Sequence, residues 1–451
     1  MPEYLAPGVY VEETSFRAKT IEGVSTSIAG FVGPTRYGPV GGEPSLLTSY
    51  TEFERIYGGI DRLIYATNVD ADIDARTFAD PAQNYMAHAV RAFFQNGGTK
   101  LYVTRIYRIP DEVAAATDAA TAALAADPAN VDLTVAVADL ERWGHARAYI
   151  PAGGSDVHLR ARFPGQHGDM RVRFIAKFGE NVLFNSGTEA APVPALRRAQ
   201  AGDAVLICRA DGGDPHGIFT VNDAADGFLG DGADVALADL DPDTEEVRVL
   251  TAGVLTRGSG QFDDEVDHGA LSFNANRAQD LREYFQTDPS SRREQMTLPL
   301  AIVDSPDQAG DFARVIFPDL ADATQSEFDA DNNAASTAQE RRDARVATTR
   351  AQLAVYTLEG GHDGFAPTPL EYEGEENITS KTGLLSLTDV EDISIVAAPG
   401  YSMLYDTSAG DADQIQQHLI THCEEMRYRG AVLDSGPGMD LTEVRDQRSR
   451  I

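Results

Sequence analysis

Acidic side chains provide the spacings in this chain that come closest to a chemical site. Asp329, Asp331, Asn333 and Glu340 follow the ligand spacing of an EF-hand calcium loop. Ala334 stands where that loop needs a glycine, and a side chain there resists the positive φ of the turn. The start of a capped helix explains the same residues, and we favour that interpretation over a calcium site.

A second acidic run alternates like a calcium loop but lacks its closing ligand. Asp70, Asp72 and Asp74 alternate, whereas Pro81 occupies the place of the closing glutamate. These residues are therefore predicted to form a solvated acidic loop.

Other signatures of catalysis are missing from the sequence. It contains no G-x-x-x-x-G-K-[ST] phosphate-binding loop and no G-x-S-x-G turn, and its nine histidines show no paired-ligand spacing. The glycine pairs at 97–98 and 360–361 could cradle an anion, but a helix end or a turn is the better interpretation. We therefore predict no catalytic residue, no metal and no cofactor.

Composition narrows the class of protein further. The 451 residues include 37 basic and 71 acidic side chains, a formal net charge of −34, which repels nucleic acid phosphates. Such acidity suits either a polymer-forming subunit that must stay soluble or a salty habitat, and neither explanation is preferred. No apolar run approaches membrane-span length, and no secretory signal is present. With Cys208 and Cys423 as the only cysteines, synthesis in a reducing cytoplasm is expected.

The first part of the chain is predicted to alternate strands and helices. A buried strand over 27–32 ends at Gly33-Pro34, and a helix capped by Ser49 runs to Gly58-Gly59. Asp80-Pro81 is expected to start the next helix, which ends at Gly97-Gly98 before a strand over 100–107. Four residues are predicted to lie in the core: Phe31, Phe93, Phe94 and Ile395.

The last part of the chain shows the same alternation. An apolar strand over 393–398 precedes a helix that starts at Asp411 and ends at Gly430, and residues 431–433 form a further buried strand. Between the two parts, residues 114–126 and 329–354 have helical composition, and residues 170–174 and 247–251 alternate as half-buried strands.

We therefore predict an α/β (α+β) fold with a discontinuous core built from both chain ends. Its parts are an N-terminal assembly arm over 1–25, a core α/β first half over 26–110, inserted β-rich peripheral structure over 111–345, and a second core half over 346–451.

Short segments on both sides of the insertion resemble contractile tail sheath proteins of phages and phage-like injection systems. They are residues 2–13, 30–39, 50–59, 89–98 and 101–106 on one side, and 358–364, 390–400 and 422–424 on the other. The resemblance covers about residues 1–107 and 346–448, and the insertion is only loosely similar.

The resemblance implies a structural subunit, not an enzyme, that polymerises helically around an inner tube and contracts to drive the tube through a target envelope. Strand exchange between subunits is then expected at Val9, Tyr10, Val11, Glu12 and Glu13, with linker points at Pro7, Gly8 and Gly23. The implied partners are further copies of the chain, arranged in hexameric rings around the tube, together with the inner tube, baseplate and tail terminator proteins. No nucleic acid and no membrane insertion are expected, and the subunit would pass from the cytoplasm of the producing cell into a tail or an extracellular particle.

Two alternatives to the polymerising sheath stay open. The family's C-terminal arm normally follows the point at which this sequence stops, so that arm is expected to be missing here, either because the sheath sequence is truncated or because the protein is a shorter paralogue. A non-polymerising paralogue that acts as a baseplate-proximal initiator, cap or adaptor is therefore the second hypothesis. A glycan hydrolase within the insertion is a distant third, because it would need two carboxylates placed in one cleft.

Overall fold

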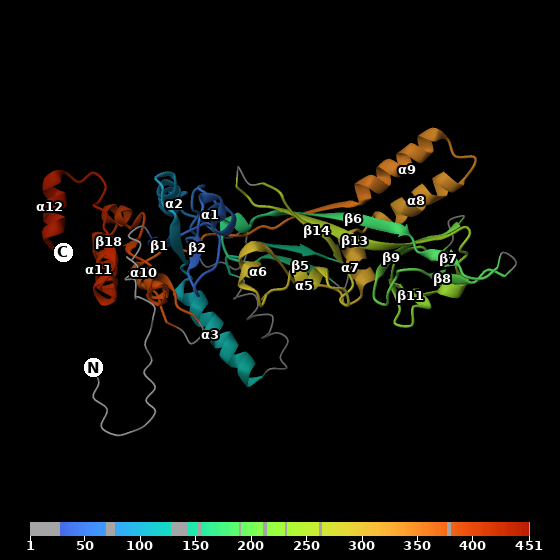
Figure 1. The fold of residues 1–451 in the computed structure, drawn as a ribbon, viewed down its shortest axis with the longest axis horizontal. Coiled ribbons are helices and arrows are strands. Elements are labelled where there is room, and N and C mark those ends of the chain that lie inside the picture. The colour runs from blue at the N-terminus through green and yellow to red at the C-terminus, as the bar shows by residue number, and fades with distance from the viewer. Residues whose placement is uncertain are drawn as a thin grey trace, which may run out of the picture.

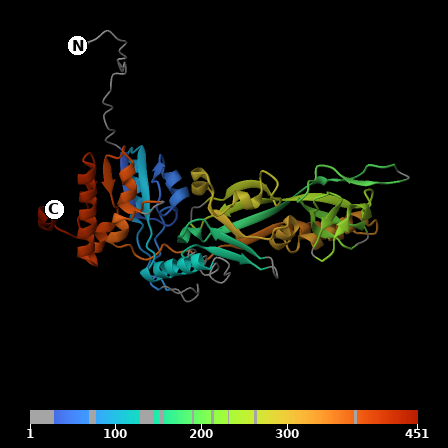
Figure 2. The same cartoon turned by 90° about the horizontal axis from the view of Figure 1, so that it is seen from below.

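The computed structural model describes residues 28–68, 77–127, 143–151, 156–188, 191–210, 214–230, 232–260, 264–376 and 380–450. These residues have mixed α and β structure, which confirms the predicted class at that level. The molecule is elongated, with a five-stranded sheet at one end and an eight-stranded sheet extending toward the other (Figures 1 and 2). No helix of the described part is long and apolar enough to cross a membrane.

Strands from both parts of the chain lie side by side in the five-stranded sheet (Figure 1). Its order is β18-β17-β1-β3-β2, in which the first four strands run parallel and β2 is antiparallel to β3. The strands are β1 (Ile28–Pro34), β2 (Ser45–Leu47), β3 (Lys100–Ile106), β17 (Ile395–Ala397) and β18 (Gly430–Val432).

Helical segments cover both faces of this sheet, so its strands are apolar almost throughout. On one face, Ala29 and Leu101 pack against α1 (Tyr50–Tyr57) and α2 (Tyr85–Gln95). On the other face, Val32 and Val396 pack against α10 (Pro369–Glu373), η5 (Gly383–Asp389), η6 (Tyr401–Asp406) and α11 (Ala409–Met426).

The eight-stranded sheet is antiparallel and is covered differently. Its order is β12-β11-β10-β9-β13-β6-β16, with β14 also paired to β13. Along β6, Val172, Phe174 and Ala176 are buried in the largest hydrophobic core, whereas the alternate residues from Arg171 to Lys177 are exposed or half-buried. The strands are β6 (Arg171–Asn181), β9 (Ala204–Cys208), β10 (Gly217–Val221), β11 (Gly227–Leu229), β12 (Val235–Ala236), β13 (Glu246–Arg257), β14 (Val266–Ser272) and β16 (Leu353–Thr357).

Smaller sheets and the remaining helices complete the described structure. β15 (Leu300–Asp304), β5 (Val157–Ala161) and β4 (Arg147–Ile150) form a three-stranded sheet, and β7 (Leu183–Asn185) pairs with β8 (Pro194–Leu196). The other helical segments are α3 (Asp111–Ala126), η2 (Gln166–Gly168), η4 (Leu237–Asp239), α5 (Leu281–Tyr284), α6 (Arg292–Thr297), α7 (Ala309–Ile316), α8 (Leu320–Asn332), α9 (Ala338–Ala351) and α12 (Leu441–Arg450).

Several local predictions are confirmed, and one helix start is wrong. Ser49 caps α1 by accepting a hydrogen bond from the Glu52 amide, and Gly58 ends that helix in a left-handed conformation. The start predicted at Asp80-Pro81 is wrong because Asn84 caps α2 instead, accepting from the Ala87 amide. Asn84 is fully buried, so its position depends on tertiary contacts that the local sequence does not show.

The predicted core residues pack as expected but are only partly buried. Phe31, Phe93, Phe94 and Ile395 all lie against the cluster beneath α1 and α2, each at intermediate exposure. The Phe93 ring stands edge-on to Phe31 and to Phe94. These aromatics line the margin of the core because the fully buried places beneath them are taken by residues such as Val90 and Leu101.

Two predictions about the last part of the chain need correction. The helix expected to end at Gly430 ends at Met426, where Arg427 takes a left-handed conformation, because Gly430 already belongs to β18. The strand expected to be buried at 431–433 forms as β18 but is largely exposed, because it is the outermost strand of its sheet.

The boundary predicted between residues 345 and 346 falls inside α9. Beyond that helix, β16 pairs with β6 in the eight-stranded sheet. The helical stretch predicted over 329–354 is therefore too long at its end, because residues 353–354 already belong to β16. The alternation of side chains that marks this strand begins only at the end of the helical composition.

Candidate assembly edge

β18 is an open edge of the five-stranded sheet. It pairs with β17 on its inner side, and no strand among the described residues pairs with its outer side. Val432 within the strand is 49% exposed and Tyr428 just before it is 44% exposed. An edge strand with free main-chain groups can accept a further strand by main-chain hydrogen bonding.

Polar contacts hold the start of β18 against the sheet. The Gly430 amide donates to the Ser394 carbonyl at 2.9 Å. Arg429 Nη1 lies 2.7 Å from Nε2 of His422 on α11, and Arg429 Nη2 donates to the Val390 carbonyl. Burial, with a smaller contribution from Arg429, lowers the pKa of His422 to about 4, so a neutral imidazole accepts this hydrogen bond at neutral pH.

The chain after β18 is held in the same way. The Tyr401 hydroxyl donates to the Asp434 carbonyl at 3.2 Å and accepts from the Asp434 amide at 3.0 Å. The strand is therefore anchored before and after its three residues from the inner side. No strand of the described part of the chain occupies its outer side.

The direction of the main-chain groups follows from this anchoring. Successive residues of a strand point their amides to opposite sides, and the Gly430 amide points to β17. The Ala431 amide is therefore directed away from β17. Ala431 is the residue at which a strand added from outside would find a donor.

A buried arginine joins this sheet to the rest of the molecule. Arg105 on β3 is 1% exposed, and its Nη1 donates to the carbonyls of Gly38 and Pro164, each at 2.7 Å. Pro164 lies shortly after β5, so the guanidinium ties β3 to the three-stranded sheet. Burial lowers the pKa of Arg105, and Asp363 opposes that shift.

Asp363 ties three segments together beside Arg105. It is 3% exposed, and its carboxylate accepts from the Ile64 amide at 2.8 Å and from the Gln166 amide at 2.9 Å. Burial raises the pKa of Asp363 to about 6, although both hydrogen bonds, Arg105 and Arg36 act to lower it.

A second carboxyl, Asp169, completes the join. Its Oδ1 accepts from the Gly361 amide at 2.7 Å, and burial raises its pKa to about 7. Gly165 allows the segments to approach closely: its φ is +133°, and a Cβ on it would lie 2.1 Å from the Arg36 carbonyl oxygen. A Cβ on Gly361 would lie 2.4 Å from the Gly165 carbonyl oxygen, so the glycine pair at 360–361 lies at a crowded crossing of chain segments and not at a helix end or turn.

The sequence-predicted exchange residues lie outside the described residues. This holds for Val9, Tyr10, Val11, Glu12 and Glu13, for the linker points Pro7, Gly8 and Gly23, and for the acidic run at Asp70, Asp72 and Asp74. The edge strand, Arg105 and Asp169 were not singled out from the sequence. Two resembling segments, 101–106 with Arg105 and 358–364 with Asp363, were the available signals for the join.

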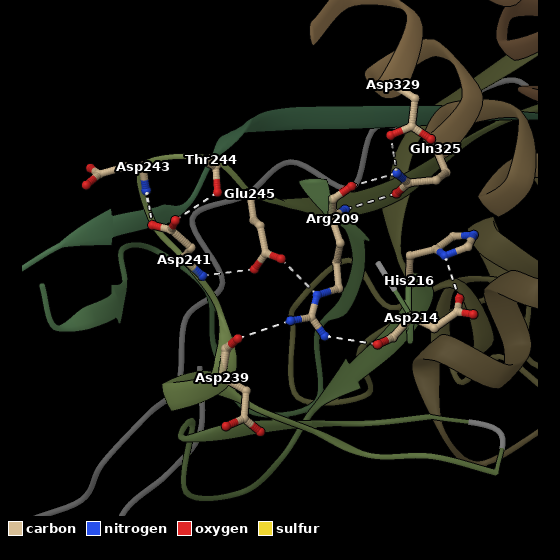
Figure 3. A network of polar contacts seen from close by, with 10 residues as sticks. All are labelled: Arg209, Asp214, His216, Asp239, Asp241, Asp243, Thr244, Glu245, Gln325 and Asp329. Atoms are coloured by element: carbon tan, nitrogen blue, oxygen red, sulfur yellow. Dashed lines mark hydrogen bonds and ion pairs between the residues drawn. The ribbon is translucent and has the colours of Figure 1, made fainter. Parts of the chain in front are cut away.

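The residues with EF-hand spacing take part in structural contacts instead of forming a loop. Asp329 lies on α8 and accepts from Gln325 Nε2 at 2.9 Å, while Gln325 bonds the amide and the carbonyl of Arg209 (Figure 3). Arg209 Nε in turn donates to Glu245 at 2.9 Å, so this network fastens α8 to the end of β9.

The other members of that spacing stabilise α9. Glu340 and Thr337 form a capping box at its start, which confirms the capped-helix interpretation. Asp331 pairs with Arg345 at 2.9 Å across α8 and α9. Within the described ranges, no group of three or more His, Cys, Asp or Glu side chains could hold a metal ion.

Comparisons with known proteins found no match to this chain, either among protein-family models or among curated proteins. The observations that bear on function are therefore the geometry of the β18 edge and the resemblance of the short sequence segments.

Proposed function

We propose that this chain is the structural subunit of a contractile tail sheath, which polymerises helically around an inner tube and contracts to drive the tube through a target envelope. The observation that carries the proposal is the open edge of β18, anchored on its inner side at Arg429 and Asp434 and exposed on its outer side. A subunit that accepts a strand from its neighbour at such an edge can form an open, head-to-tail polymer.

The distribution of the resembling segments supports the proposal. Those within the described residues fall on β1, α1, α2, β3 and β17, on α11, and on the join that holds Asp363. All of them belong to the five-stranded sheet, to its covering helices or to its attachment. Under the proposal this sheet is the sheath core built from both chain ends, and the eight-stranded sheet is the peripheral insertion.

The N-terminal arm of a neighbouring copy is the strand proposed to pair with β18. Val9, Tyr10 and Val11 have the β-branched and aromatic character of a short strand, and Pro7 and Gly8 precede them as a linker. The further partners under this proposal are the inner tube, the baseplate and the tail terminator proteins. The subunit needs neither a cofactor nor a catalytic site for this role.

Electron microscopy of the full chain and of a variant lacking residues 1–20 tests the proposal. The full chain is expected to form striated tubes, alone or when the inner tube is supplied, and the deletion variant is expected to form none. Circular dichroism and the thermal unfolding midpoint of the variant show whether the remaining fold is intact.

Tubes of equal length and number from the deletion variant would contradict the role of the arm. Discrete particles from the full chain, with and without inner tube and baseplate, would instead favour the non-polymerising initiator, cap or adaptor.

A further inference from the structure

A broad hollow of about 940 Å³ lies over β13 and β14, on the face of the eight-stranded sheet opposite its largest core. Its floor comes from β13 and β14, through residues such as Thr251 and Ala270, and its walls come from the end of β6 and from the segments after β8 and β14. We call it the basic groove, because three arginines line it: Arg197, Arg198 and Arg277.

Arg277 is fixed in the groove by a buried carboxylate. Asp203 is 1% exposed and accepts from Arg277 Nε at 2.7 Å and from Arg277 Nη2 at 2.5 Å. Asp203 also accepts from Asn274 Nδ2 and from the Gln200 amide, so its oxygens are fully used. The hydrogen bonds that Arg277 donates to Asp203 raise the pKa of Arg277, which keeps this guanidinium charged and in place.

The other cations are more exposed than Arg277. Arg197 and Arg198 are exposed, and the Arg197 guanidinium lies 5.1 Å from the centre of the Phe184 ring. Lys177 crosses the same face, since a Cβ built on Gly253 would lie 3.1 Å from its Nζ. The acidic groups that face these cations are Glu180 in the lining and Asp203 beneath Arg277.

This concentration of cations is unusual in a chain with 71 acidic and 37 basic residues. Copies of such a chain repel one another over most of their surface, and a close contact between them needs a local region of opposite charge. The basic groove supplies that region, and the surface most able to complement it is the acidic surface of a second copy.

We propose that the basic groove docks an acidic surface of a neighbouring copy and so forms a second contact between subunits, separate from the β18 edge. This inference rests on the proposed function, because the neighbouring copy is taken to be a subunit of the same assembly. In such a contact Arg277 acts as a fixed anchor, and Arg197 and Arg198 complete the charge complementarity around it.

A charge-reversal pair tests the contact in the full chain. R197E/R198E removes two exposed cations from the groove, and R293E/R342E changes the net charge by the same amount at exposed arginines of α6 and α9 outside it. Self-association is measured by sedimentation velocity over a protein concentration series, and pelleting gives the critical concentration for polymers. The groove variant is expected to associate about tenfold more weakly than the control variant.

Equal association of the two variants would overturn the inference, and so would the absence of any self-association by the unmodified chain. A labelled oligonucleotide that binds the unmodified chain but not the groove variant, with self-association unchanged, would assign the groove to a nucleic acid and also overturn it. Micrographs of the same samples separate the two proposals. If tubes form equally well with R197E/R198E, the groove contact is refuted and the sheath proposal stands. If association depends on the groove but gives particles other than tubes, the sheath proposal is refuted and the groove contact stands.

Discussion

The two large sheets leave different parts of themselves open to solvent. The five-stranded sheet is covered by helical segments on both faces and is open at its β18 edge. The eight-stranded sheet is buried on both faces over β9 and β10, whereas around β6, β13 and β14 one face carries half-exposed side chains and the basic groove. A neighbour can therefore reach the first sheet through main-chain pairing at an edge, and it can reach the second through side chains on the uncovered part of a face.

The difference between an edge and a face has a consequence for assembly. Main-chain pairing at an edge tolerates changes of side chain, whereas charge pairing across a face depends on the residues that carry it. We infer that the β18 edge provides the connection between subunits and that the basic groove adjusts how they pack. Matched changes in the two sheets test this division.

The largest effect is expected from a proline at the β18 edge. In A431P the substituted residue loses an amide directed away from β17, so the fold should be retained while strand addition is blocked. We expect the critical concentration for polymerisation, measured by pelleting, to rise at least about tenfold.

V355P is the matched variant in the other sheet. Val355 is 45% exposed on the edge strand β16, and the antiparallel ladder to β6 directs its amide outward. This variant should polymerise like the unmodified chain. Loss of polymerisation in V355P but not in A431P would reverse the roles given to the two sheets.

The next largest effect is expected where the two regions are joined. R105L leaves the carbonyls of Gly38 and Pro164 without this donor and removes one of the two positive charges, Arg105 and Arg36, that act on Asp363. Removing one member of a buried charged group typically costs about 3–5 kcal/mol of unfolding free energy. Urea unfolding should show this loss.

The exposed arginine of α9 provides the control for R105L. R345L removes exposed ion pairs with Asp331 and Glu327 and should leave the urea midpoint nearly unchanged, because surface ion pairs contribute little to stability. Similar losses in the two variants would show that Arg105 does not hold the sheets together.

The smallest effect is a pH dependence at the same join. Because the pKa of Asp169 is raised from 3.8 to about 7, the folded protein binds this proton more tightly than the unfolded chain. The contribution of the protonated carboxyl to stability is complete below pH 4 and is lost as the pH rises through about 7. The stability of D169N, which stays neutral, relative to that of the unmodified chain should therefore increase as the pH rises from 5 to about 7, and D169N should be the more stable of the two near pH 8.5.

Urea midpoints at several pH values measure this difference, with D118N on the exposed surface of α3 as the control. A difference between D169N and the unmodified chain that is constant from pH 5 to pH 8.5 would mean that Asp169 does not titrate in this range.

Local patterns in the sequence predicted much of the five-stranded sheet. Ser49 and Gly58 mark the ends of α1, and the apolar runs that form β1, β3 and β17 are short and continuous because helices cover both of their faces. The start of α2 was wrong because a buried asparagine, Asn84, provides the cap in place of Asp80.

The candidate sites depend on contacts between residues that are far apart in the chain. Arg105 meets Pro164, Asp363 meets Ile64, and Arg277 meets Asp203, and no local spacing indicates any of these contacts. The exposure of β18 was also missed, since an apolar run of three residues is equally compatible with a central strand and an edge strand.

The most direct test of the account is disulfide trapping between β18 and the arm of a neighbour. Val432→Cys is combined in turn with cysteine at Val9, Tyr10 or Val11, in a chain that also carries Cys423→Ala, and assembled particles are oxidised and run on a non-reducing gel. Pairing of the arm with β18 predicts a ladder of covalently linked copies for at least one of the three pairs, and no ladder when Val432→Cys is present alone. Tubes that form normally and show no linked copies for any pair would contradict it.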